Sequence, residues 1–305
     1  MARTRYAPDR GLTSRMLVTM FLLGLVYVVF VTAMFVISTT LGTIAMIFAV
    51  LFLLGQYYFS DKLALFAMHG QEVTPQQAPE LHGVIDRICA LSDTPKPRVA
   101  IADVDVPNAF ATGRNQKKAV VCVTSGLLRR LDQVELEGVL AHEMAHIAHR
   151  DVAVMTIASF LGIVAGLITR FGLEWGLWGG FSRRDNDQNT GLILLAVIAV
   201  SAVAYAISFL LTRALSRYRE LSADRAAALL TGRPSALASA LTKVTGEIAR
   251  IPTKDLRAAQ PFNAFFFTPA FGRGASVATL FATHPPLEKR LQQLSTISAQ
   301  LSRGA

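Results

Sequence analysis

Charge and cysteine are both scarce in this sequence. Only 17% of its 305 residues are Asp, Glu, Lys or Arg, whereas 52% are hydrophobic and the mean hydropathy is +0.42. Soluble globular domains carry about 25% charged residues, so the composition argues against a fully soluble protein. Cys89 and Cys122 have no C-x-x-C partner, which excludes a disulfide framework or a cysteine zinc cluster and predicts reduced, buried thiols.

Nucleic-acid recognition is a second class that the sequence excludes, although the net charge is +9 and the pI about 9.9. The sequence has no RNA- or DNA-binding motif, no internal repeat and no low-complexity tract. Its basic residues cluster beside apolar runs, as membrane orientation and contact with anionic lipids predict. We therefore expect a lipid bilayer as a partner and no nucleic acid.

Four uncharged runs explain the deficit of charge, and they predict four transmembrane spans. A bilayer-spanning helix needs roughly 20 apolar residues, and a buried helix of a soluble protein rarely stays apolar all round over that length. The shortest run lies near the lower limit, so either a full crossing or a partly interfacial position remains open for it. The runs cover residues 16–37, 39–59, 152–169 and 191–211.

The first run is longer than a signal-peptide core and no clear A-x-A site follows it, so it reads as a retained anchor. Four arginines within the first 15 residues, opposed by Asp9 alone, place this end in the cytoplasm by the positive-inside rule. Two hairpins then return both soluble segments to the cytoplasm. The expected divisions are a cytoplasmic N-terminus (1–15), a first transmembrane hairpin (16–60), a first soluble segment (61–151), a second transmembrane hairpin (152–212) and a second soluble segment (213–305).

The motif that carries chemistry is His142-Glu143-Met144-Ala145-His146, an H-E-x-x-H pattern. Four residues advance a helix by about 400°, so His142 and His146 share one face and can reach one Zn²⁺ at about 2.0–2.1 Å. Glu143 stands beside them, where it can take a proton from a water that the metal activates. The pattern predicts a zinc hydrolase.

The surrounding sequence predicts a helix that starts with a capping box at Asp132 and Glu135 and presents an apolar stripe to a core. Ahead of it, residues that alternate or run apolar predict strands, with residues 108–113 as a short edge strand. The expected strands are 98–102 and 118–123, the expected helices are 125–131, 212–230, 235–249 and 286–301, and residues 170–190 and 251–275 are expected to be loops.

A peptidase site needs a third protein ligand. His149 lies about 10.5 Å along the helix from His142 and cannot join it on one metal, so it is expected to support the site or lie at the surface. His69 and His82 have no motif around them and are expected at the surface. Glu220 and Asp224 are one turn apart, so one could ligate while the other holds an imidazole. A plain charge ladder with neighbouring arginines explains the same spacing equally well.

Together with these motifs, several further stretches make the sequence resemble the HtpX family of membrane-bound zinc metalloproteases, and more distantly the CAAX prenyl endopeptidases. The resemblance implies a mainly α membrane protein with two transmembrane hairpins and a gluzincin-like metallopeptidase domain carrying a small β-sheet. It also implies Glu220 as the third ligand of one zinc ion per chain, and Asp224 as a carboxylate that accepts a hydrogen bond from a ligating imidazole. The matching stretches are residues 56–62, 108–111, 139–146, 150–151, 219–224 and 283–286.

The resemblance further implies an endopeptidase in the bacterial cytoplasmic membrane that cleaves misfolded or damaged membrane proteins at the cytoplasmic face. A non-catalytic holdase or assembly factor with a structural zinc is the alternative, although such a site is normally closed by four ligands. Polypeptide substrates are expected to add as a strand along Asn108, Ala109, Phe110 and Ala111, unless this is merely a connecting strand. His284, before two prolines, either stabilises the oxyanion of the reaction or caps the last helix.

Overall fold

The computed structural model describes residues 9–37, 39–175, 188–250 and 284–304. The described residues belong to two compact units. The first is drawn from Met1–Leu12, Phe59–Ala153 and Ser216–Ala305, and the second from Thr13–Tyr58 and Val154–Leu215. The expected loop at residues 251–275 lies outside the described residues.

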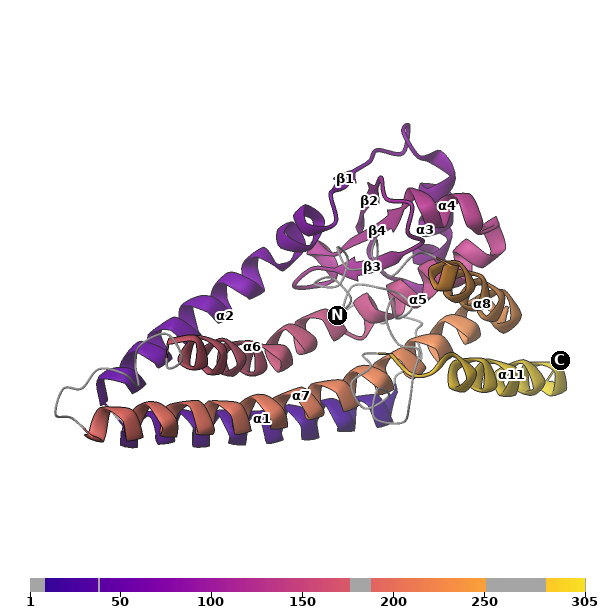
Figure 1. Cartoon of the computed structure of the whole chain (residues 1–305). Coiled ribbons are helices and arrows are strands. Elements are labelled where there is room, and N and C mark those ends of the chain that lie inside the picture. The colour runs from indigo at the N-terminus through magenta and orange to yellow at the C-terminus, as the bar shows by residue number, and fades with distance from the viewer. Residues whose placement is uncertain (1–8, 38, 176–187, 251–283, 305) are drawn as a thin grey trace. The chain divides into compact units, whose positions relative to one another are not determined.

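The second unit is made of long helices (Figure 1). They are α1 (Arg10–Ile37), α2 (Thr39–Ala67), α6 (Asp151–Trp175) and α7 (Gln188–Thr231), and the ends of several continue into the first unit. Within the second unit Phe30 and Met34 of α1 pack with Ala165 of α6 and Ala204 of α7. Residues 170–175 and 188–190, which we expected to be loop, are helical because α6 and α7 extend beyond their apolar runs.

Two of the described helices are long and apolar enough to cross a membrane. They are Arg10–Ile37 and the Leu195–Thr231 portion of α7, and only 17% of the most apolar window of each is buried. A core helix of a soluble protein would be mostly buried, so this low burial favours contact with lipid. The spans expected at 39–59 and 152–169 are helical, but the two hairpins are not confirmed and stay a prediction.

The first unit is built on a small mixed sheet whose strand order is β1-β2-β4-β3. Strand β2 (Arg98–Ala102) runs parallel to β4 (Val120–Thr124), while β1 (Gly70–Glu72) and β3 (Ala109–Thr112) pair antiparallel at the two edges. The sequence patterns predicted β2, β3 and β4 but missed β1. They also missed α3 (Pro79–Ser92).

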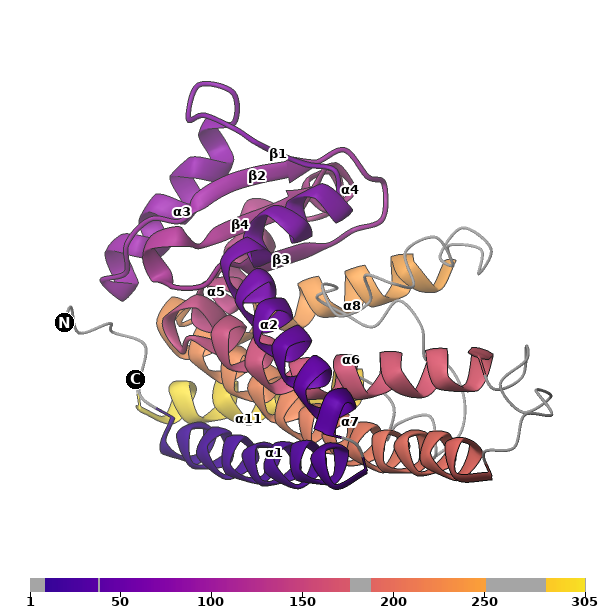
Figure 2. The ribbon, with the colours of Figure 1, turned by 90° about the vertical axis from the view of Figure 1, so that its left-hand side faces the viewer.

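Both faces of the sheet are covered, which follows from the alternation of side chains along each strand. Val99, Val121 and Val123 face the main core with α3 and α5 (Gln133–Ala148), whereas Ala100 and Cys122 face a smaller cluster against the end of α2. Figure 2 shows α5 next to the sheet. The remaining helices of this unit are α4 (Ser125–Arg130), α8 (Pro234–Arg250) and α11 (Leu287–Gly304).

Local geometry confirms two predicted helix boundaries. Asp132 caps α5, and Glu135 completes the capping box by accepting a hydrogen bond from the Asp132 N–H. Helix α7 ends at Thr231 because Gly232 follows with φ +65, a left-handed conformation that glycine adopts without strain. Helix α5 ends at Ala148, and Arg150 shortly after it also has a positive φ.

Candidate metal centre

Helix α5 is held on every side, which gives the H-E-x-x-H motif a rigid base. All residues from Glu135 to Ile147 are buried. At its start, the Glu135 carboxylate accepts hydrogen bonds from Ser239 and Lys243 of α8. Gly138 gives room for α8, since a Cβ there would lie 3.3 Å from the Leu237 backbone. A ligand pair on such a helix is fixed before any metal binds.

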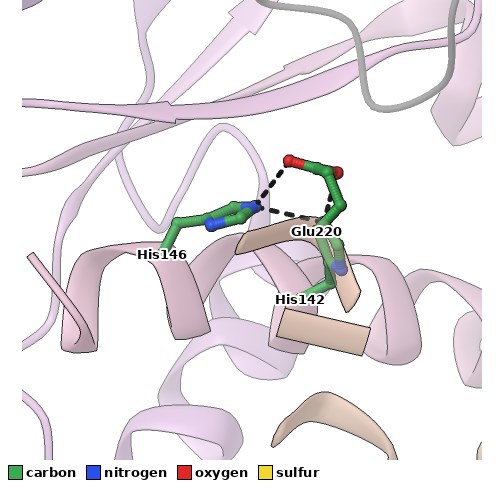
Figure 3. A group of neighbouring side chains, drawn as sticks. All are labelled: His142, His146 and Glu220. Carbon is green, nitrogen blue, oxygen red and sulfur yellow. Dashed lines mark hydrogen bonds and ion pairs between the residues drawn. The ribbon is translucent and has the colours of Figure 1, made fainter. Parts of the chain in front are cut away.

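The two motif histidines and Glu220 converge at one point (Figure 3). The two histidine Nε2 atoms lie 3.2 Å apart, and each is 3.5 Å from one oxygen of Glu220. Ligands about 2.0–2.1 Å from a tetrahedral zinc lie about 3.3–3.4 Å from each other. All three residues are buried, and their potential ligand atoms lie within 4.8 Å of one another. The residues therefore fit one zinc ion in both donor type and spacing.

Each histidine is oriented through its second ring nitrogen. The Nδ1 of His142 lies 2.9 Å from Asp224, and the Nδ1 of His146 lies 2.7 Å from Asp151. This arrangement leaves both Nε2 atoms directed toward Glu220. Carboxylate partners of this kind fix the tautomer and rotation of a metal-binding imidazole.

Two arginines support these carboxylates. Arg290 of α11 donates two hydrogen bonds of 2.7 Å to Asp224, and Arg219 of α7 lies 3.1 Å from Asp151. The sequence predicted Asp224 as a supporting carboxylate but suggested no role for Asp151 or for either arginine. An acid five residues beyond the second histidine was the available signal for Asp151. Nothing local in sequence pointed to Arg290, which is 66 residues from its partner.

The electrostatics of the two histidines differ. Burial lowers the pKa of His146 and outweighs the effect of Asp151, which favours the neutral, metal-binding form. For His142 burial acts in the same direction, but the hydrogen bonds to Asp224 and Glu220 outweigh it and raise its pKa to about 9. Metal binding through the His142 Nε2 needs the neutral ring, so a protonated His142 would release a proton on binding.

Glu143 lies on the same helix with its carboxyl group fully enclosed. Burial raises its pKa to about 7, against the lowering effect of the nearby His142 charge and a hydrogen bond from the Ala111 backbone. A carboxyl group that titrates near neutral pH is suited to take up and release a proton.

The Ala111 contact connects the site to strand β3. Thr124 N–H donates to the Asn108 carbonyl at 2.9 Å, and Phe110 is paired with Cys122. Antiparallel pairing alternates along a strand, so Ala109 and Ala111 direct their main-chain groups to the edge that β4 does not occupy. That edge faces Glu143.

The remaining histidines lie in different surroundings. His284 is buried with its Nδ1 3.0 Å from a Glu220 oxygen, and its role, either in stabilising the oxyanion or in capping the last helix, stays a prediction. His149 caps the end of α5 and is not among the ligand group. His69 is exposed, as expected. The expectation that His82 lies at the surface is wrong, because it is buried and its Nε2 bonds the Val73 carbonyl at 3.0 Å.

Comparisons with known proteins agree with this geometry. Residues 75–298 match the model of Peptidase family M48. "Protease HtpX homolog 1" of Streptomyces coelicolor is 62% identical over 98% of this chain and 97% of its own length. "Protease HtpX homolog" of Moorella thermoacetica is 48% identical over 98% of each chain.

The chain therefore belongs to Peptidase family M48. Both relatives are named HtpX protease homologs, and the family and these names support a metalloprotease activity for this chain. The crystal structure of S. mikatae Ste24p has the same fold, with a TM-score of 0.52 and 17% identity over 89% of this chain. The chain spans 62% of the length of that protein.

Proposed function

We propose that this protein is a zinc-dependent endopeptidase that cleaves misfolded or damaged membrane proteins at the cytoplasmic face of the bacterial membrane. One observation carries the proposal. The buried donor atoms of His142, His146 and Glu220 have the separations that a single zinc ion requires, and Glu143 lies beside them. Three protein ligands leave a coordination position open, as catalytic zinc sites do.

A bound zinc ion would supply a Lewis acid that polarises the substrate carbonyl and activates water at neutral pH. The protein's own groups account for the remaining steps. The Glu143 carboxylate accepts a proton from the attacking water and then delivers it to the leaving amine. Its enclosure supports this role, because burial brings its pKa to about 7.

Substrate binding is proposed along β3. A polypeptide in extended form would add as a strand to the open edge and pair with the main chain of Ala109 and Ala111. Main-chain pairing tolerates varied side chains, which suits a protease that acts on damaged proteins. The same pairing would bring the scissile bond toward Glu143, since the Ala111 N–H already contacts that carboxylate.

The test is Glu143→Gln in the detergent-purified full chain. Zinc content and melting temperature should match the wild type, because no ligand is lost. Cleavage of casein should fall by about 10²–10⁴-fold, because an amide cannot accept the proton. Turnover above a few per cent of wild type would refute the general-base role. Wild-type protein that binds zinc and cleaves nothing would favour the alternative of a zinc-stabilised holdase.

A further inference from the structure

The C-terminal helix α11 reaches the metal centre through one residue, Arg290. This arginine is only 1% exposed and is the largest fully buried side chain among the described residues. Its Nε and Nη2 donate to the two oxygens of Asp224, each at 2.7 Å. Both charged groups of the pair are thus enclosed within the protein.

Burying a guanidinium costs free energy unless a charged partner with good geometry offsets it. Here the offset is a bidentate pair, the arrangement in which arginine fixes a carboxylate plane most tightly. The Asp224 carboxylate in turn lies 2.9 Å from His142 Nδ1. The rotation of the imidazole is therefore set by a chain of contacts that runs from α11 through α7 to α5.

The other histidine provides an internal comparison. Arg219 approaches Asp151 through its Nε at 3.1 Å, and its side chain is 11% exposed against 2% for Arg290. Arg219 also belongs to α7, the helix that carries Glu220. The arginine behind His146 thus lies on a helix that also carries a proposed ligand. The arginine behind His142 lies on α11, which carries no proposed ligand.

We propose that Arg290 is a positioning residue that sets the zinc affinity of the site by holding Asp224 against His142, so that full affinity requires α11 to be docked. This inference rests on the proposed zinc site but not on cleavage. It means that the chain acquires its metal efficiently only after its last helix has folded onto α7.

A second contact between the same helices supplies a matched control. Gln293 of α11 donates from Nε2 to the Leu221 carbonyl of α7 at 3.0 Å. Gln293→Met removes this docking contact and keeps the side-chain volume. It therefore weakens the helix contact without changing the chain of contacts to His142.

The experiment measures zinc affinity by chelator competition on the full chain in detergent, with melting temperature recorded on metal-free protein. Arg290→Lys and Arg290→Met should weaken zinc binding by about 10–100-fold, as losses of ligand-supporting contacts do. Gln293→Met should stay within about 2-fold of wild type. The absorption spectrum of Co²⁺-loaded protein should change in Arg290→Lys and not in Gln293→Met.

A double-mutant cycle tests whether Arg290 acts on zinc affinity through Asp224. In an Asp224→Asn background, Arg290→Met should cost little further zinc affinity, because the carboxylate that it positions is gone. If Arg290→Met alone fails to fold, the double variant Asp224→Asn/Arg290→Met can still be measured, because removing both charges leaves no buried charge unpaired. Equal losses in Arg290→Lys and Gln293→Met, or wild-type zinc affinity with only a lower melting temperature, would overturn the proposal. Zinc binding that follows the prediction in a protein without protease activity would reject the proposed function alone.

Discussion

At the scale of single residues, Glu220 and Asp224 show how two acids one turn apart acquire different roles. Both are buried on α7, yet Glu220 lies against the Nε2 atoms and Asp224 against a Nδ1 atom. The direction in which each imidazole nitrogen points therefore separates a ligand from its support. Sequence spacing alone left this choice open.

We expect Glu220→Ala to lose stoichiometric zinc and activity, because only two protein ligands remain. Asp224→Ala should weaken zinc binding by about 10–100-fold and keep activity at saturating metal. Zinc content after dialysis and activity against free zinc concentration measure both effects. If Asp224→Ala strips the metal while Glu220→Ala retains it, the two roles are reversed.

His284 is the residue whose chemistry is most open to test. Its Nδ1 lies 3.0 Å from Glu220, so its ring lies beside one of the proposed zinc ligands. We expect His284→Ala to lower kcat by roughly 10²-fold with nearly unchanged KM and zinc content. Normal kcat with a lower melting temperature would instead identify a helix-capping residue. Loss of zinc would assign His284 to the support of Glu220.

At the scale of elements, the proposed role of β3 in substrate binding can be tested, because its residues alternate between pairing with β4 and facing the other edge. Ala109→Pro removes an N–H that points to the open edge, so we expect a higher KM with little change in melting temperature. The matched control is Phe110→Pro, which removes an N–H on the side of β4 and should destabilise the fold. An unchanged KM in Ala109→Pro, together with a lower melting temperature, would show that β3 merely connects its neighbours.

The elements that the sequence predicted are those with local signals. The capping box of α5, the glycine that ends α7 and the apolar residues of β2 and β4 all lie within a few residues of the structure they determine. Strand β1 covers only Gly70–Glu72, too short for a pattern to emerge. Local signals also cannot reveal His82, whose burial depends on a carbonyl nine residues away.

The same reasoning explains which residues of the site were predictable. His142, Glu143 and His146 follow from one helical turn, and the spacing of Glu220 and Asp224 limits them to a few roles. Arg290 and His284 contact these acids only because α11 folds back onto α7. Their partnership is a property of tertiary structure, so a single sequence without its fold could not specify it.

At the scale of the whole molecule, the site constrains the membrane topology. His142 precedes the runs at 152–169 and 191–211, and Glu220 follows them, yet the two side chains lie 3.5 Å apart. Both runs must therefore cross the membrane or neither can, because a single crossing would separate the ligands by a bilayer. The two-hairpin prediction meets this requirement with the first crossing pair at 16–37 and 39–59.

Cysteine labelling of intact cells tests that topology. In a Cys89→Ala background Cys122 should not be labelled, because its thiol is buried and burial raises its pKa to about 12. Two hairpins predict that Ser38→Cys and Gly180→Cys react with a membrane-impermeant maleimide, because both lie in the outer connections. Asn115→Cys, on an exposed turn of the first unit, should react only after lysis. Labelling of Asn115→Cys in intact cells would place the metal centre outside. Labelling at residue 38 without labelling at residue 180 would mean that the second pair of runs stays at the cytoplasmic interface, the one other arrangement that keeps His142 and Glu220 on the same side.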